Sequence, residues 1–454
     1  MLAKVIYASQ TGAHLDSHVL TGGGTDDTAV LQKTLDLAKE YGGLHLIMDG
    51  AALTTGLVVH AHTTIECLNK GCGFFLADHS NRSLITNAHP SSEKIIDHDI
   101  ALLGGTYNHN CLRQAHHLPE GVHYSQGDSF VVAISFFGIE NLLVRDVTVR
   151  NQRTFAFLIA NWQKVTVENI SLELPDLIPG GNQDGIHILG PGRFLLIKNV
   201  QGRTGDDLIA INADEEFTDE KNFFHPCAST GPITDVVVDT VMVDDASQIL
   251  RVLSRKNLVD RVTVRNVTGS YRSFGFYLSA WDYHKKGHPG NFGSLVFENI
   301  DVRQTKPDYT YTEPFLFRIS GRHRSLMIKN IRYFDPSDDR YIVHVEGESD
   351  IVDIGTTPAE IGSLLIDGLH VQDAGRTPQS RPYLMVRGRV KRMTVRNSEV
   401  FHDDDKKNVL LATDGEFAGI DRLVLNGVMT TKSTILIEDR EGKIGERHTV
   451  NILK

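Results

Sequence analysis

The sequence predicts an all-β protein, a right-handed parallel β-helix of about ten coils with an N-terminal capping helix. Three observations carry this prediction. A short motif recurs ten times at intervals of 23 to 40 residues, beginning after residue 130. Apolar residues inside the motif alternate with a period of two, which is typical of β-strands. Helical periodicity is absent from the repeats, so the repeated unit is a coil of strands that stacks on its neighbours.

Each repeat consists of a short apolar run, an Asn or Asp, and a second short apolar run. Asn and Asp tolerate left-handed backbone and can bond the neighbouring main chain, as a sharp bend between strands requires. We expect these residues to form a ladder along the stacked coils and to take no part in chemistry. They are Asp146, Asn169, Asn199, Asp239, Asn266, Asn299, Asn330, Asp367, Asn397 and Asn426.

Before the repeats, the chain carries the only segment with convincing helical spacing of apolar residues, and it ends at Gly42. Thr25 is placed to cap this helix, which would cover the open end of the first coil. We expect one domain over residues 1–454. Its parts are an N-terminal segment with the cap helix (1–45), the coils (46–440) and a C-terminal end (441–454).

Composition excludes several classes of protein. Hydrophobic residues make up 41% and charged residues 23%, which is typical of a globular chain. The net charge of −11, with acids and bases interspersed, argues against a nucleic-acid partner. No apolar stretch is long enough for a membrane span. The N-terminus has no signal-peptide pattern, so we expect a cytoplasmic protein unless a leader has been removed. The oligomeric state is left open.

No cofactor and no metal ligand set is expected. The four cysteines show no Cys or His pattern with zinc-ligand spacing, so we interpret them as free thiols. The segment 213–231 is rich in Asp and Glu. A solvated loop is the favoured interpretation, with a site for a cation or a basic substrate group as the alternative.

Three carboxylates, Asp184, Asp206 and Asp207, each lie at the start of a short strand-like run. If the two runs stack on neighbouring coils, their backbones lie about 4.8 Å apart. Clustered carboxylates can serve as the acid and the base of glycoside hydrolysis. Adjacent strand residues point to opposite faces, so Asp206 and Asp207 can share a cleft only at a corner. Gly205 would permit the sharp entry. Ordinary surface or turn carboxylates are the alternative.

Residues 182–185 (Asn-Gln-Asp-Gly) and 205–207 (Gly-Asp-Asp) resemble the Asn-Thr-Asp and Gly-Asp-Asp motifs of polygalacturonases, glycoside hydrolase family 28. Residues 25–32 resemble the N-terminal signature of the pectate-lyase-like β-helix superfamily. The resemblance implies that Asp206 is the general acid and that Asp184 and Asp207 hold and activate water. It also implies a pectin-like substrate.

The chain departs from the family where the substrate carboxylate is gripped. Gln248 aligns with the family's Gly-His-Gly segment, and Tyr277 occupies a cation position of its Arg-Ile-Lys segment. Either the sugar is not galacturonate, or Arg251 and other residues replace this clamp. For Arg251 the alternative is an exposed strand arginine. The predicted substrate-binding residues are Asn182, His225, Gln248, Arg251, Tyr277 and Trp281. His187 is interpreted as a satisfied strand histidine.

The function predicted from these features is an inverting glycoside hydrolase acting on a pectin-like or other plant or microbial oligosaccharide or polysaccharide. An exo mode is favoured because a cytoplasmic enzyme meets imported fragments. Two alternatives stay open. One is a polysaccharide lyase or other carbohydrate-modifying enzyme that uses Arg251 and Ca²⁺ at the carboxylates. The other is a non-catalytic, tailspike-like glycan-binding protein. Sugar, linkage and cleavage mode are not predicted.

Overall fold

The computed structural model describes residues 3–116, 130–215, 224–280, 288–305, 315–334, 341–347, 357–373, 382–402 and 408–454. These residues form two compact units, Met1–Pro232 and Ile233–Lys454, and each unit is described separately. Both consist of parallel strands stacked coil on coil, so the predicted right-handed parallel β-helix is confirmed. Among the described residues, no helix is long and apolar enough to cross a membrane.

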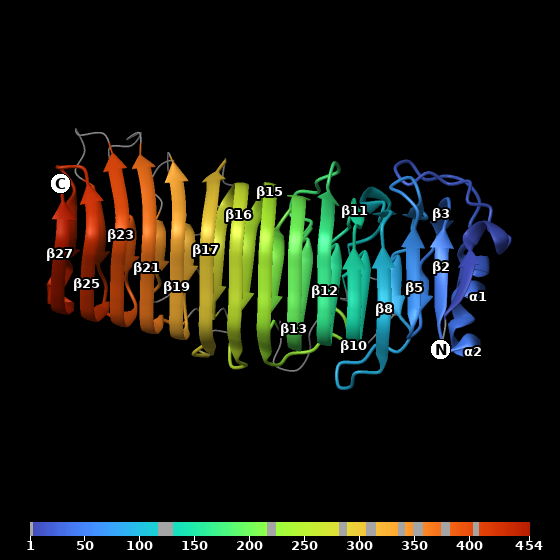
Figure 1. Ribbon diagram of the computed structural model, residues 1–454, viewed down its shortest axis with the longest axis horizontal. Helices are drawn as coiled ribbons and strands as arrows, with labels where there is room; N and C mark the ends of the chain where they lie inside the picture. The colour runs from blue at the N-terminus through green and yellow to red at the C-terminus, as the bar shows by residue number, and fades with distance from the viewer. Residues whose placement is uncertain are drawn as a thin grey trace. The chain divides into compact units, whose positions relative to one another are not determined.

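The described residues of the first unit form fourteen strands and a short helical segment near its N-terminus (Figure 1). Its elements are β1 (Lys4–Tyr7), α1 (Thr28–Asp36), α2 (Ala38–Tyr41), β2 (Leu44–Met48), β3 (Ala51–Thr54), β4 (Leu57–Val59), β5 (Thr63–Cys67), β6 (Gly73–Leu76), β7 (Ile85–Asn87), β8 (Asp97–Leu103), β9 (Thr106–Asn108), β10 (Ile134–Arg145), β11 (Thr148–Arg150), β12 (Phe157–Glu173), β13 (Ile186–Arg203) and β14 (Asp207–Asn212).

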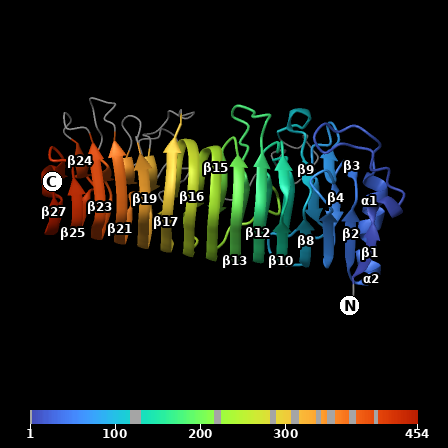
Figure 2. The same cartoon turned by 45° about the horizontal axis from the view of Figure 1, so that its top comes forward.

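Strand pairing gives this unit three faces. The first face stacks β1, β2, β5 and β8 with the middle of β10, β12 and β13. The second stacks β3, β6, β9 and β11 with the later parts of β12 and β13. The third stacks β4, β7, the starts of β10, β12 and β13, and then β14. Strands β4 and β9, which Figure 1 does not label, are labelled in the turned view of Figure 2.

Helices α1 and α2 cover the N-terminal end of the first unit, as predicted (Figure 1). Leu31 and Leu35 are fully buried, and the side-chain amide of Gln32 bonds the backbone of Val58 in β4 in both directions. The predicted cap was wrong. Thr25 bonds Asp16, and it is the carboxylate of Asp26 that accepts the Thr28 N–H at the helix start.

In the second unit, the part of the chain that the structure describes forms thirteen strands. They are β15 (Ile233–Leu253), β16 (Val259–Ser279), β17 (Phe292–Gln304), β18 (Phe315–Ile319), β19 (Arg322–Phe334), β20 (Tyr341–Val345), β21 (Glu360–Asp373), β22 (Leu384–Val386), β23 (Arg389–His402), β24 (Val409–Thr413), β25 (Gly419–Thr430), β26 (Ile435–Asp439) and β27 (Ile444–Leu453). Residues 441–454, expected to be the C-terminal end of the domain, hold strand β27, which pairs in parallel with β25.

The predicted ladder of bend residues is present in both units. Asn266, Asn299 and Asn330 have φ of 59°, 58° and 50°, and each donates its side-chain N–H to the bend residue one coil before it. In the first unit Asn199 donates to Asn169, and Asn169 to Asp146, both at 2.8 Å. Three predicted bend residues are not left-handed themselves. After Asp239, Asp367 and Asn426 the following residue takes the positive φ: Thr240, Gly368 and Gly427.

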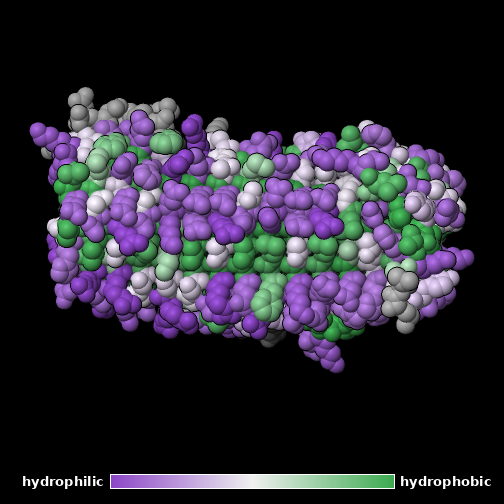
Figure 3. Space-filling model, in the orientation of Figure 1, coloured by the Kyte–Doolittle hydropathy of each residue, from purple (hydrophilic) through white to green (hydrophobic). Residues whose placement is uncertain are grey.

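Rows of like side chains run across the strands, because residues in register lie one above another. In the second unit, Val237, Thr263, Val296 and Met327 are in register on successive strands and half-buried, and they form a mainly apolar row. Figure 3 shows such a hydrophobic row between hydrophilic rows. Beside it, charges of opposite sign meet on neighbouring coils, as between Arg265 and Asp239 at 2.8 Å.

We expect the ladder to stabilise the coils through both backbone geometry and side-chain bonding. Asn299→Ala loses two ladder bonds and forces a Cβ-bearing residue without a polar side chain into left-handed backbone. Asn299→Gly loses the same bonds but tolerates the conformation. The alanine variant should therefore unfold at lower urea than the glycine variant, by about 1–2 kcal/mol. Equal midpoints for the two variants would contradict a backbone role for this position.

Candidate active site

The predicted carboxylates lie at the corner where the chain enters the third face of the first unit. Asp184 precedes β13, and Asp207 is the first residue of β14. The pairing of β13 with β14 places Ile186 against Ile209, and the same register sets Asp184 against Asp207. A bond of 2.8 Å from the Gly185 N–H to the Asp207 carbonyl continues this register. The two aspartates therefore occupy equivalent positions on neighbouring coils, about 4.8 Å apart along the stack.

Asp206 lies in the bend just before β14. The Asp206–Asp207 pair therefore lies at a corner, as it must if both side chains are to share a cleft. The backbone N–H of Asp206 points to the Gln183 carbonyl at 3.3 Å, and its carbonyl accepts the Thr204 hydroxyl at 2.9 Å. Asp206 is half-buried, whereas Asp184 and Asp207 are buried. Of the three carboxylates, Asp206 is thus the most accessible to a ligand.

Two glycines make this corner possible because they leave room for the neighbouring coil. A Cβ on Gly185 would collide with the Leu208 carbonyl oxygen and lie 2.6 Å from the Leu172 side chain. A Cβ on Gly205 would lie 3.0 Å from the Gln183 Cβ. We expected Gly205 to supply a conformation that other residues avoid. Its φ lies outside the left-handed range, and its contribution is the close approach of two coils.

His187 connects Asp184 to a second buried acid. Its Nδ1 lies 2.7 Å from Asp184 Oδ2, and its Nε2 lies 2.7 Å from Glu215 Oε2. The Asn212 side-chain N–H also contacts Glu215 Oε2. The interpretation of His187 as a satisfied strand histidine holds, but its partner is one of the predicted catalytic carboxylates.

Electrostatics around His187 favour the imidazolium. Burial alone disfavours the charged ring, but the Glu215 charge and the hydrogen bonds to both acids outweigh it and raise the pKa of His187 to about 9. At neutral pH the ring therefore carries a proton on each nitrogen. A buried cation with two acids as partners fixes the orientation of the Asp184 carboxylate.

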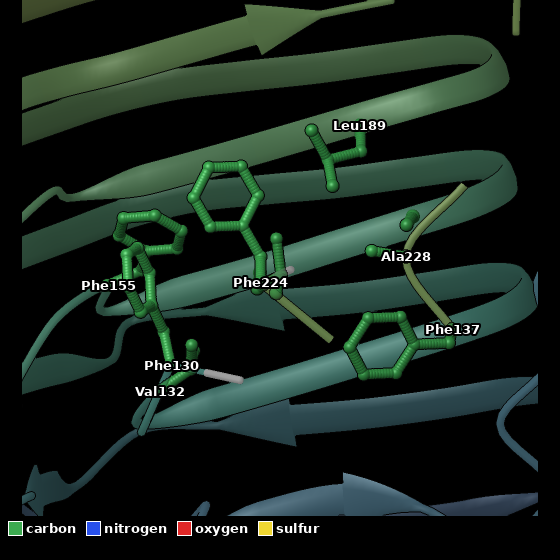
Figure 4. Packing of buried hydrophobic residues seen from close by; sticks show 9 residues of the cluster. Phe130, Val132, Phe137, Phe155, Leu189, Phe224 and Ala228 are labelled. Atoms are coloured by element: carbon green, nitrogen blue, oxygen red, sulfur yellow. The ribbon is translucent and has the colours of Figure 1, made fainter. Parts of the chain in front are cut away.

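Aromatic side chains cover this network on the outer side of the third face. Phe155 stacks on His187 with centroids 4.2 Å apart, and Phe224 meets the same ring edge-on at 5.4 Å. Both belong to a buried cluster drawn in Figure 4, whose members are Phe130, Val132, Phe137, Phe155, Leu158, Ala160, Leu189, Phe224 and Ala228. The cluster keeps the His187 network dry, which strengthens its charge interactions.

His225, a predicted substrate-binding residue, lies away from the carboxylates. Its ring stacks on Phe137 at 4.1 Å and lines a cavity of about 470 Å³. Val58, Thr86 and Ser135, which are in register on three neighbouring coils, form part of the cavity floor. The cavity is large enough for a small ligand and lies on the same face as His187, with Leu158 between them in register.

Of the other predicted contacts, Asn182 is half-buried and has left-handed backbone with φ of 49°. It immediately precedes the corner that holds Asp184. Trp281 lies outside the described residues. The interpretation of the acidic segment as solvated was wrong for two residues, since Asp214 and Glu215 are 1% and 6% exposed.

In the second unit, Arg251 and Tyr277 are in register on neighbouring strands. Arg251 is buried, so the alternative of an exposed strand arginine was wrong. Gln248, three residues before it, is also buried. Burial raises the pKa of Tyr277 to about 12, although the Arg318 charge opposes this, so the phenol keeps its proton.

Arg318 was missed in the sequence. It follows Tyr277 in register one strand further, with its guanidinium 5.5 Å from the Tyr277 ring centroid. It also pairs with Glu346, and both side chains are 2% exposed. A lone arginine inside the apolar run of β18 was the available signal, because a charge is buried only when it is paired.

The network predicts a pH dependence of stability. The pKa of His187 is raised above its ordinary value of about 6.5. The protonated ring therefore contributes fully to the free energy of unfolding below pH 6.5. This contribution is lost as the pH rises through about 9. His187→Gln should cost about 3–5 kcal/mol at pH 6 and less at pH 10. Urea denaturation at both pH values measures this, and an identical pH slope in the two proteins would contradict a buried imidazolium.

Part of the chain matches a known protein family. Residues 122–268 match the family model described as glycosyl hydrolases family 28. A polygalacturonase from Gossypium barbadense is 26% identical over 171 residues, which is 38% of this chain and 37% of that protein. The chain thus matches little more than a third of the length of this relative.

Solved structures share the fold. A family 28 exopolygalacturonase from Yersinia enterocolitica superposes with a TM-score of 0.53 at 12% identity, covering 99% of this chain and 78% of that one. The surface adhesin PfbA of Streptococcus pneumoniae gives 0.55 at 13% identity, covering 96% and 92%. At such identities the likeness concerns the fold alone. The family match covers the segment that holds all three aspartates, so the predicted resemblance to glycoside hydrolase family 28 is confirmed for residues 122–268 of a chain that folds as a right-handed parallel β-helix.

Proposed function

We propose that this protein is an inverting, exo-acting glycoside hydrolase that cuts pectin-like or other plant or microbial oligosaccharides. One observation carries the proposal. Asp184 and Asp207 occupy equivalent positions on neighbouring coils, and Asp206 lies at the corner between them. The segment that matches the family 28 model contains all three residues.

In this proposal Asp206 is the general acid, because it is the most accessible of the three carboxyls. It donates its proton to the glycosidic oxygen as the bond from that oxygen to the anomeric carbon breaks. Asp184 and Asp207 hold a water molecule on the opposite side of the sugar and take one of its protons as its oxygen attacks the anomeric carbon. The product then has the inverted configuration. Asp206 has lost a proton and the Asp184–Asp207 pair has gained one, so transfer of one proton back to Asp206 restores the starting state.

His187 supports the base in this scheme without touching the substrate. The imidazolium 2.7 Å from Asp184 Oδ2 stabilises the ionised carboxylate and directs it. The proposed scheme requires Asp184 and Asp207 to be ionised and Asp206 to carry the proton. The three acids can thereby divide the roles of acid and base.

The substrate class is proposed from the curated relatives, which are named as polygalacturonases. Gln248, Arg251 and Tyr277 are the proposed sugar contacts of the second unit. Arg318 adds a cation beside Tyr277, but its charge is balanced by Glu346. The family's clamp for a uronate carboxylate is therefore not reproduced residue for residue, and neutral sugars belong in any substrate screen beside uronides.

Replacing the proposed acid tests the assignment. Asp206→Asn should lower kcat on a cleavable oligosaccharide by about 10²–10⁴-fold and leave binding of that oligosaccharide unchanged. Asp146→Asn is the matched control, because Asp146 has left-handed backbone at a ladder position where other coils carry Asn. Wild-type kcat in the Asp206→Asn variant would overturn the assignment.

The products distinguish the alternatives. Inversion predicts that NMR of fresh product shows the anomer opposite to the bond that was cut, and exo action predicts monomers or dimers from long chains. Retained configuration or mainly internal fragments would refute those two parts of the proposal. Product that absorbs in the ultraviolet would indicate a lyase. Binding without turnover on any uronide or neutral glycan would leave a glycan-binding protein.

A further inference from the structure

Two histidines and an aspartate meet on the surface of the first unit, at the bend that leads into its first face. His62 precedes β5, and His98 and Asp99 belong to β8 on the next coil. The register of β5 and β8, in which Thr64 pairs with Ala101, sets His62 against Asp99. A backbone bond of 2.9 Å from the His62 N–H to the His98 carbonyl fixes the two coils at this point.

The side chains converge on one carboxylate oxygen. His62 Nδ1 lies 3.2 Å and His98 Nδ1 lies 2.9 Å from Asp99 Oδ2. The two imidazole rings meet edge-on, with centroids 4.4 Å apart and an interplanar angle of 87°. One possible ligand atom from each residue lies within 4.8 Å of the others. Among the described residues, this is the one group of three or more His, Cys, Asp or Glu side chains that meets that criterion.

These distances match the coordination shell of a small metal ion. Zinc bound at about 2.0–2.1 Å with tetrahedral geometry separates its ligand atoms by about 3.3 Å. The two measured separations, 2.9 and 3.2 Å, are close to that edge length. The third separation, between the ligand atoms of the two histidines, is within 4.8 Å, so rotation of the exposed imidazole side chains could let one ion contact all three residues.

We propose that His62, His98 and Asp99 bind a divalent transition-metal ion of the zinc class. Two imidazole nitrogens and one carboxylate oxygen suit Zn²⁺, Ni²⁺ or Cu²⁺, whereas Mg²⁺ and Ca²⁺ prefer oxygen ligands throughout. The three side chains are 44–47% exposed. Water can therefore complete the coordination shell.

The surroundings orient the ligands. The Asn141 side-chain N–H bonds the other oxygen of Asp99, Oδ1, from the next coil. Partners of this kind hold a coordinating carboxylate in place. His62, Asp99 and Asn141 all have left-handed backbone, with φ of 60°, 57° and 57°. The ligands thus stand on a strand-bordered bend that recurs from coil to coil, which fixes their spacing better than a free loop would.

The site lies on a different face from the carboxylate corner, so we assign it a stabilising role separate from the proposed hydrolysis. A metal ion bound there joins two neighbouring coils near the capped end of the first unit. Because the ion binds only when both coils are folded, it should raise the melting temperature of the protein.

Calorimetric titration of the metal-free, full-length protein with ZnCl₂ tests the proposal. We expect one zinc per chain, no comparable binding of MgCl₂, and weaker binding on acidification because protons compete for the imidazoles. His98→Gln and His62→Gln should each weaken zinc binding about 10–100-fold and remove the zinc-dependent rise in melting temperature. Co²⁺ in place of zinc should give a visible absorption band in the wild type that both variants lose.

His370→Gln is the matched control. His370 Nδ1 lies 3.5 Å from Glu399 Oε2 on the neighbouring strand of the second unit, and among the described residues no second histidine joins this pair in a three-residue ligand group. This variant should bind zinc as the wild type does. Zinc binding that persists in both His62→Gln and His98→Gln would place the ion among the other histidines and overturn the proposal. So would the absence of zinc binding by wild-type protein with a normal melting temperature.

Discussion

Register between parallel strands is the constraint on which the rest of each unit depends. Backbone hydrogen bonds fix each coil residue for residue on the coil before it, so a side chain has a defined neighbour one strand spacing away. This is why asparagines distant in sequence form ladders, why opposite charges meet in rows, and why Asp184 stands against Asp207. In a β-helix, the position of a residue within its coil determines which side chains are its neighbours on adjacent coils. Loops at the corners contribute further contacts that this register does not determine.

The features that could be predicted from sequence are the strands and bends whose positions follow from the repeat within each coil. The strands β2, β4 and β6 and the bend asparagines follow from local patterns of apolar and turn residues. Contacts that depend on a corner or on a returning loop could not be predicted. Glu215 was assigned to a solvated segment because nothing local shows that it reaches His187. Arg318 contacts Glu346, and His62 contacts Asp99, although the two residues of each pair lie on different coils. No short spacing motif in the sequence therefore indicates these pairs.

Buried charged side chains are found in both of the regions described in detail. In the first unit a protonated His187 lies between two acids, and in the second Arg318 lies beside Glu346 and Tyr277. Each arrangement takes charges out of water, which is costly unless partners and hydrogen bonds compensate. Their hydrogen bonds at 2.7 Å from His187 to both acids, and the pairing of Arg318 with Glu346, give these side chains defined directions. Placed on the strands that carry the proposed chemistry and the proposed sugar contacts, they supply the rigidity that positioned catalysis requires.

The asparagine ladder also bears on how a chain of this kind can change in length. One residue added inside a strand would move every later side chain of that coil out of its column and turn inward residues outward. Residues added at a corner leave the columns intact, and a whole extra coil repeats contacts that already exist. Such proteins can therefore gain or lose length in steps of one turn of the solenoid, and can acquire new specificity through their corner loops, while the strands beneath keep their sequence pattern.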